Sequence, residues 1–210
     1  MLRRPVLDEG GLSAEPAALG GEFEHELVRF DGGTQAGVRG AGSLSEVVLA
    51  GVDLSQARLG PALMLTDVAL RRVDLSGAVL AEVTARRLEL HGCRAMGLRL
   101  SFALVADVFV DGCQFDYATL HVARVKGPVC FRDCTFREAT IGGDLSGVIF
   151  DGCGFAGAGF EAGAAKGCDL RSSQLVGASG LRTLRGARIT ADQAVSVADR
   201  LATEAGLIVQ

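Results

Sequence analysis

Aromatic residues and prolines are scarce in this chain of 210 residues, which has no Trp, one Tyr and four Pro. A globular enzyme of this length usually carries a larger aromatic core. No apolar run approaches the roughly 20 residues that a membrane-spanning helix needs. The N-terminal stretch MLRRPVLDEGGLSAEP has two arginines without the apolar region of a signal peptide, which predicts a cytoplasmic protein.

Motifs of common enzyme chemistry are lacking as well. The sequence shows no Ser/His/Asp constellation, no glycine loop that would cradle a phosphate, and no HExxH pair. Of the three histidines, His25 precedes the regular part of the chain and His121 is expected to face solvent. We therefore expect a protein that is not an enzyme, with no cofactor, no metal site, no small-molecule substrate and no membrane partner.

Charge of one sign does not dominate the chain, although the net charge is -4. Residues 1–55 and 107–169 are net acidic, whereas residues 56–106 are net basic. The basic cluster includes Arg71, Arg72, Arg86, Arg87, Arg94 and Arg99. No aromatic residues are interleaved with these arginines, which argues against direct binding of nucleic acid.

A five-residue period organises most of the chain. A large apolar residue recurs at every fifth position from Leu44, Leu49 and Leu54 onward, ending near Leu170 and Leu175. Two positions before most of these residues stands a small or β-branched one. Neither the helical period of 3.6 nor the strand period of 2 produces this spacing. Segments such as AGVDLSQARL, RRVDLSGAVL and KGCDLRSSQL resemble the A(D/N)LXX motif of the pentapeptide-repeat family.

The resemblance implies an all-β solenoid, a right-handed quadrilateral parallel β-helix in which four pentapeptides make one square coil. The large residue and the small residue two before it point inward. Coils must stack, because a single coil leaves its apolar interior exposed. Residues 44–189 are expected to form about seven coils, a rod of roughly 34 Å at the usual strand spacing.

Breaks in the period coincide with turn-forming residues. Two sides have six residues instead of five, and they contain Gly60-Pro61 and Gly127-Pro128. One side is a residue short and contains Gly142-Gly143. Glycine and proline suit bulges and tight turns, so these breaks are interpreted as structural adjustments of the coil.

Cysteines recur at the small inward position of successive coils. They are Cys93, Cys113, Cys134 and Cys153, with Ser173 next in the column and Cys168 on the neighbouring side. A tetrahedral zinc site needs ligands that converge, which a straight ladder at a spacing of about 4.8 Å does not provide. Parallel Cβ vectors and a reducing cytosol argue against disulfides. We expect buried thiols that act as small hydrophobes.

Residues one coil apart stack into columns, so the sequence also predicts outer surfaces. One outward column contains Glu89, Phe109, Cys130, Ile149 and Asp169. Its three consecutive apolar residues, Phe109, Cys130 and Ile149, form a candidate contact strip. The alternative is that they are ordinary exposed apolar residues. The flanking column alternates in charge through His91, Asp111, Arg132, Asp151 and Arg171, which favours a stabilising role.

The two ends lack the five-residue period. Residues 1–20 carry no pattern and are expected to be mobile. Residues 21–43 are expected to form a strand and an irregular N-terminal cap. In the segment 190–210, Thr190 and Gln193 match a capping box, which predicts an amphipathic helix from about 191 to 205. The apolar face of that helix comprises Ala194, Val197, Ala198, Leu201 and Ala205.

The helix has two possible roles. It covers the open end of its own solenoid, or it docks with a second copy of the chain. In topoisomerase-protecting members of the family a C-terminal segment makes the dimer, so the resemblance implies a possible homodimer.

Two functions remain open. The first is a rigid, non-catalytic scaffold that binds a protein partner of unknown identity. The second, implied by the resemblance to the quinolone-resistance branch of the family, is a DNA mimic that binds and protects DNA gyrase. The candidate acidic residues for the mimic are Asp107, Asp111, Asp116, Asp144 and Asp151. Against it, the net charge is modest, and residues 56–106 are basic where a mimic should be acidic.

Overall fold

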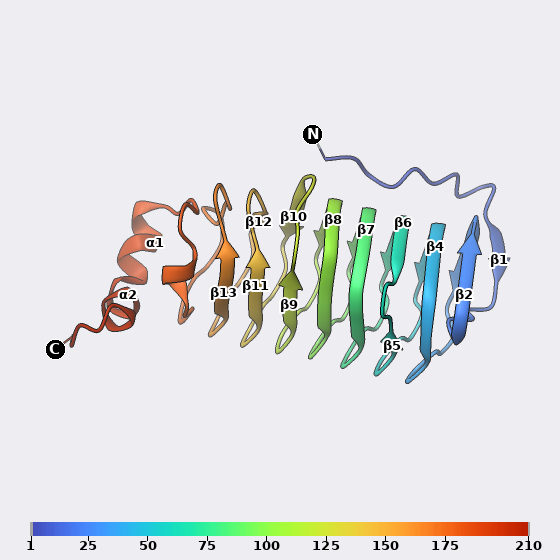
Figure 1. The fold of residues 1–210 in the computed structure, drawn as a ribbon, viewed down its shortest axis with the longest axis horizontal. Helices are drawn as coiled ribbons and strands as arrows, with labels where there is room; N and C mark the ends of the chain where they lie inside the picture. The colour runs from blue at the N-terminus through green and yellow to red at the C-terminus, as the bar shows by residue number, and fades with distance from the viewer. Residues whose placement is uncertain (1, 210) are drawn as a thin grey trace.

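Parallel strands stack into a long rod in a computed structural model of the protein, which describes residues 2–209 (Figure 1). All thirteen strands belong to one hydrogen-bonded sheet. They are β1 (Ser13–Glu15), β2 (Gly21–Glu26), β3 (Val28–Asp31), β4 (Arg39–Ala50), β5 (Arg58–Leu59), β6 (Met64–Arg71), β7 (Val79–His91), β8 (Arg99–Asp111), β9 (Thr119–Val122), β10 (Val129–Arg132), β11 (Thr140–Asp144), β12 (Ile149–Asp151) and β13 (Gly159–Ala164). Among the helices of the described chain, none is long and apolar enough to cross a membrane.

The strand register confirms the solenoid that the resemblance to the pentapeptide-repeat family implies. Leu70 of β6 pairs with Leu90 of β7, and Leu90 pairs with Val110 of β8. Each pairing joins residues one coil apart, and every ladder is parallel. The result is a β-solenoid of about seven turns.

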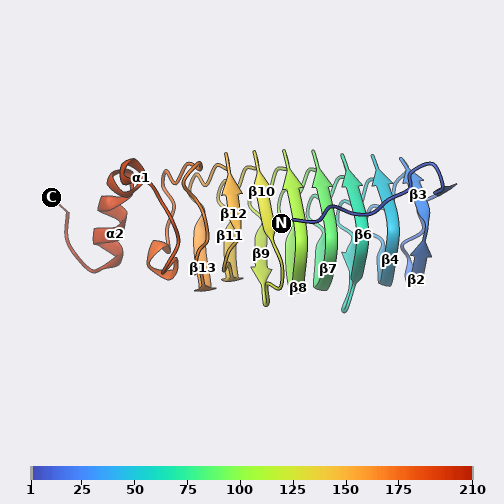
Figure 2. The same cartoon turned by 90° about the horizontal axis from the view of Figure 1, so that it is seen from above.

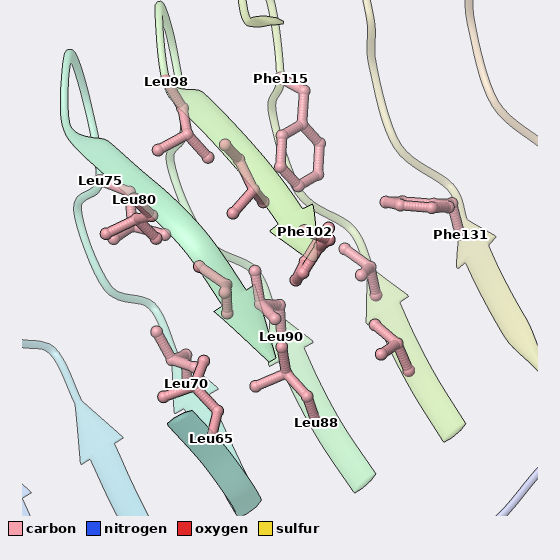
Figure 3. A pocket seen from close by; sticks show the side chains of 14 residues that line it. Leu65, Leu70, Leu75, Leu80, Leu88, Leu90, Leu98, Phe102, Phe115 and Phe131 are labelled. Atoms are coloured by element: carbon pink, nitrogen blue, oxygen red, sulfur yellow. The ribbon is translucent and has the colours of Figure 1, made fainter. Parts of the chain in front are cut away.

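Aromatic ladders fill the interior of the later coils. Phe136 lies between Phe115 and Phe155, with ring centroids 5.3 and 5.1 Å apart and nearly parallel planes. A second stack joins Phe131 and Phe150 at 5.2 Å. Earlier coils carry leucines at the equivalent positions, and an apolar cavity of about 30 Å³ lies where the two kinds of lining meet (Figure 3).

The breaks in the period fall at irregularities of the ladders. Gly60-Pro61 lies between β5 and β6, and Gly127-Pro128 lies between β9 and β10. The register of β11 against β13 shifts between Gly143 and Asp144. Gly143 has a φ of +86°, and a Cβ atom there would overlap the carbonyl oxygen of Val122. Glycine is therefore required at this position by both conformation and space.

Regular coiling begins earlier than the sequence pattern indicates. β2 and β3 pair with β4 in parallel, which brings Phe30 opposite Leu49. Phe23, Val28 and Phe30 are buried, so residues 21–31 belong to the solenoid and not to an irregular cap. Residues 2–12 carry no strand and run along the outside of the rod, where the sequence predicted a mobile segment (Figure 2).

The C-terminal end carries three short helical elements. They are a 3-10 helix, η1 (Leu181–Thr183), and the α-helices α1 (Ala191–Ser196) and α2 (Ala198–Glu204). The predicted capping box is present, because Thr190 accepts a hydrogen bond from the Gln193 amide and Gln193 accepts one from the Thr190 amide. The helical segment breaks at Val197, whereas the sequence pattern predicted one uninterrupted helix.

Candidate protein-binding face

One side of the rod carries the predicted apolar column. We call it the strap face; it consists of β3, β10, β12 and the C-terminal ends of β4, β6, β7 and β8. Cys130 pairs in register with Phe109 on one side and with Ile149 on the other. The three residues of the candidate strip are thus neighbours on consecutive coils, as the spacing predicts. Ile149 is 45% exposed and Cys130 is half-buried, but Phe109 is only 6% exposed.

Phe109 is buried because the N-terminal strap, residues 2–12, lies across this face (Figure 2). The guanidinium carbon of Arg4 lies 3.4 Å from the centroid of the Phe109 ring. The same guanidinium forms an ion pair with Glu89, at 2.6 Å between Nη1 and Oε1. A cation over an aromatic face is attracted by the ring quadrupole, so Arg4 covers the strip through both charge and stacking.

Backbone amides of the strap bind two carboxylates at the corner of the coils. The Arg3 amide donates to Oδ1 of Asp107, and the Val6 amide donates to Oδ1 of Asp67, each at 3.0 Å. Burial raises the pKa of the Asp67 carboxyl, but hydrogen bonds from Arg87 and from the Val6 amide outweigh it, so the pKa lies below its usual range. Asp67 is therefore held ionised under the strap.

The far end of the strap is held by ion pairs and apolar contact. Glu9 contacts Arg71 and Arg29, and the hydrogen bond from Arg71 is the main reason that the pKa of Glu9 is lowered. Leu7 and Leu12 pack on a small cluster formed by Val48, Ala50 and Ala69. From Ser13 the chain joins the sheet, because β1 pairs with β3.

Sequence reasoning missed the strap because a long-range contact leaves no period in the strap itself. One weak signal was present: Leu2, Leu7 and Leu12 stand five apart, and all three are half-buried. This spacing equals the five-residue period of the coils. However, three leucines are too few to indicate a repeat.

The charged column beside the strip pairs only around Asp111, since Arg171 pairs with Asp169 of the neighbouring column and Asp151 accepts a hydrogen bond from the Ser172 hydroxyl. Asp111 accepts a hydrogen bond from Arg132 at 2.6 Å and lies 2.9 Å from Nδ1 of His91. The Arg132 hydrogen bond is the main reason that the pKa of Asp111 is lowered. Since Asp111 of β8 contacts side chains of both adjacent coils, it stabilises the stacking of β7, β8 and β10.

The structure does not bring the five candidate acidic residues onto one surface. Asp107 lies at the corner under the strap, whereas Asp111 and Asp151 lie on the strap face. Asp116 lies on the following side, 3.7 Å from Arg137, and Asp144 lies on the preceding side, where it accepts a hydrogen bond from the Ser146 amide. The chain turns a corner after every five residues, so acidic residues at irregular intervals point in different directions.

The side opposite the strap face is basic in one column. Arg39, Arg58, Val79 and Arg99 are paired in succession along β4, β5, β7 and β8. Three arginines in one row of four positions give that side a positive potential over the first coils.

The C-terminal helices cover one end of the solenoid, but only two of the five residues of the predicted apolar helix face are buried or half-buried there. Val197 is buried and Leu201 is half-buried, whereas Ala194, Ala198 and Ala205 are exposed. The main contact is one that the sequence did not indicate. The buried side-chain amide of Gln193 donates to the carbonyl oxygens of Leu170 and Ser173, at 2.7 and 2.6 Å.

Apolar residues remain on the outer surface of this end. Val195 is 77% exposed and Ile208 is 87% exposed. These two residues expose more apolar surface than the small side chains of the exposed alanines Ala194, Ala198 and Ala205.

All six cysteines are free thiols. Cys93, Cys113, Cys134, Cys153 and Cys168 are buried in the coil interior, and burial raises the pKa of the Cys168 thiol to about 12. No group of three or more metal-ligating side chains converges within residues 2–209. The burial of these five cysteines fits the interpretation that they act as small hydrophobic residues. A thiol with a pKa as high as that of Cys168 is unreactive at neutral pH.

Comparison with known proteins gives matches only among solved structures. No family model matches the chain, and no curated protein matches it. HetL, a pentapeptide repeat protein involved in heterocyst differentiation regulation in the cyanobacterium Nostoc, is 19% identical with a TM-score of 0.41, covering 82% of this chain and 84% of HetL.

A second similar structure is QnrB1, a plasmid-mediated fluoroquinolone resistance protein. The full-length form is 19% identical with a TM-score of 0.43, covering 91% of this chain and 99% of QnrB1. A trypsin-treated variant of QnrB1 is 21% identical with a TM-score of 0.45, covering 91% and 96% of the two chains. Sequence identities and TM-scores this low do not allow the function of HetL or QnrB1 to be assigned to this chain. The assignment of residues to coils follows from the strand register of the chain itself.

Proposed function

We propose that this pentapeptide-repeat β-helix is a non-catalytic scaffold that binds a protein partner through the strap face. The observation that carries the proposal is the row of Phe109, Cys130 and Ile149 on consecutive coils, with Ile149 exposed at 45%. A stacked β-sheet holds such a row rigidly, so binding orders few side chains and loses little entropy.

The proposal is tested by charge substitution on two sides of the rod. Ile149→Asp should weaken partner binding in a pull-down, because it places a carboxylate in the apolar strip. Val176→Asp is the matched control, since Val176 is 65% exposed and lies on the next side. Equal binding of both variants and wild type would exclude the strap face.

A DNA mimic that protects DNA gyrase is the second candidate. The rod shape of the solenoid supports it, but its carboxylates lie on several sides and the opposite side carries arginines. Purified protein should inhibit gyrase supercoiling, or relieve fluoroquinolone poisoning, at micromolar concentration if the mimic function holds. No effect at any concentration would remove this candidate and leave the scaffold.

A homodimer through the C-terminal end is proposed as the assembly that either function would use. Its support is the exposure of Val195 and Ile208 beside the end of the coil. Light scattering should give twice the chain mass for wild type and a lower mass for a Val195→Asp variant. A single-chain mass for wild type over the micromolar range would exclude the dimer.

A further inference from the structure

The N-terminal strap is held as a bound ligand would be, and not as part of the core. Leu7 and Leu12 are half-buried, and Val6 is 70% exposed. The polar contacts of the strap are ion pairs and hydrogen bonds, in which side-chain carboxylates of the solenoid accept from backbone amides of the strap. The strap crosses the strands of the sheet without pairing with them, so it is separable from the solenoid (Figure 2).

From these contacts we infer that the strap face is a docking surface for an extended, arginine-bearing segment of a partner protein, and that the chain's own strap occupies it as a competing internal ligand. The inference rests on the proposed scaffold function and names its partner chemistry. An arginine of the segment takes the place of Arg4, stacked on Phe109 and paired with Glu89.

The spacing of the corner carboxylates suits an extended chain of any sequence. Asp67, Arg87 and Asp107 lie on three consecutive coils, so the two carboxylates are about 9.6 Å apart along the rod. The amides that they bind belong to residues three apart, and three extended residues span about 10 Å. The match between coil spacing and backbone length lets these carboxylates hold the main chain of a segment.

The charge of this surface selects the segment. The strap donates backbone hydrogen bonds to Asp67 and Asp107. Arg4 of the strap forms an ion pair with Glu89 and lies over the face of the Phe109 ring. Guanidinium satisfies the carboxylate and the ring together, because it is planar and weakly hydrated. A neutral or acidic segment would leave Glu89 without its counter-ion.

Apolar flanks complete the recognition. Leu2 of the strap lines a hollow of about 510 Å³ together with Cys130 and Ile149. A partner segment with an apolar residue before its arginine would reach this hollow and cover the remaining part of the strip. The segment is thus an extended stretch in which apolar residues flank an arginine.

The inference is tested with a fluorescein-labelled peptide of residues 2–10, LRRPVLDEG, and full-length proteins. Glu9→Gln in the protein loosens the internal strap by removing its ion pairs with Arg71 and Arg29, without changing the surface under Arg4. Fluorescence anisotropy should show that this variant binds the peptide about fivefold more tightly than wild type, as the loss of such exposed pairs implies.

Two further variants test whether the peptide arginine stacks on Phe109. Phe109→Ala in an Arg4→Ala, Glu9→Gln background should weaken peptide binding about tenfold, because it removes the stacking platform of the peptide while the internal strap no longer uses that ring. Tyr117→Ala is the matched control: this aromatic also lies under an arginine, Arg137, but on another side of the rod. A peptide with alanine in place of Arg4 should lose affinity by a similar factor.

Several results would overturn the inference. They are absence of binding to the Glu9→Gln variant, equal binding by the Phe109→Ala variant, and equal binding of the alanine peptide. If the Glu9→Gln protein has a higher mass than wild type by light scattering, and the peptide returns it to the wild-type mass, the occupant is the strap of a second copy. None of these results bears on the Ile149→Asp pull-down, so failure here is distinguishable from failure of the scaffold function.

Discussion

The side-chain amide of Gln193 lies 2.6 Å from the carbonyl oxygen of Ser173 and 2.7 Å from that of Leu170. The Leu170 carbonyl also accepts a hydrogen bond from the Ser173 amide, whereas Gln193 is the only donor to the Ser173 carbonyl among residues 2–209. A solenoid end is an open edge, and unpaired backbone groups at such an edge cost free energy when water is excluded. Gln193 thus ends the hydrogen-bonded stack.

Substitution of Gln193 by leucine should destabilise the protein by about 1–3 kcal/mol. It leaves the covered Ser173 carbonyl without a donor and removes one of the two donors to the Leu170 carbonyl, while keeping the side-chain volume. Urea unfolding followed by circular dichroism measures the change. Val176→Ala is the control and should shift stability by less than about 0.5 kcal/mol, since Val176 is exposed and lies outside the proposed dimer contact. Equal effects of the two variants would mean that the bonds of Gln193 contribute nothing.

The aromatic ladder should make the largest single contribution to the core. Phe136→Ala removes a fully buried ring that is stacked on both sides, and it should cost about 3–5 kcal/mol. Thermal and urea unfolding provide the measurement, with the exposed Tyr117→Ala as reference. A loss below 1 kcal/mol, on the order of a surface substitution, would contradict the ladder's role.

Gly143 and Gly147 separate conformational strain from steric overlap. Both have positive φ, but a Cβ at Gly147 meets nothing within 4 Å, whereas one at Gly143 overlaps the Val122 carbonyl. Gly147→Ala should therefore cost about 1 kcal/mol, and Gly143→Ala should cost about 1–3 kcal/mol more. Parallel unfolding curves of the two variants decide the matter, and coincident midpoints would refute the overlap.

Acid should release the strap before it unfolds the rod. Glu9 and Asp67 have pKa values below their ordinary 4.5 and 3.8, so their stabilising contribution is present above those values. It is lost as the pH falls through the lower, folded-state values. The chain has no Trp, so a Leu7→Trp variant reports on the strap alone.

The tryptophan emission of that variant should shift to the red as the pH falls below about 4, while circular dichroism keeps its β signal. Adding Glu9→Gln should reduce the acid transition, because one of the titrating groups is gone. Emission that changes only together with the β signal would show that the strap and the solenoid unfold as one unit.

The five-residue period and the resemblance to the pentapeptide-repeat family together predicted the solenoid, the stacked columns and the inward cysteines. The reason is local repetition: each pentapeptide buries the same two positions, so inward and outward residues follow by counting. Phe109, Cys130 and Ile149 were placed on one outward column in this way, and the register bears this out. The capping box at Thr190 was also predicted, because its bonds join residues three apart.

What only the tertiary structure decided are the contacts between distant, non-repeating residues. Arg4 reaches Phe109, Glu9 reaches Arg71 and Gln193 reaches Ser173 through side-chain geometry that no period encodes. The acidic residues likewise scatter over different sides, because the corners turn them apart. The sequence by itself determined a rod with a stacked core, and the folded chain determined which face of that rod is covered, by what, and how its end is closed.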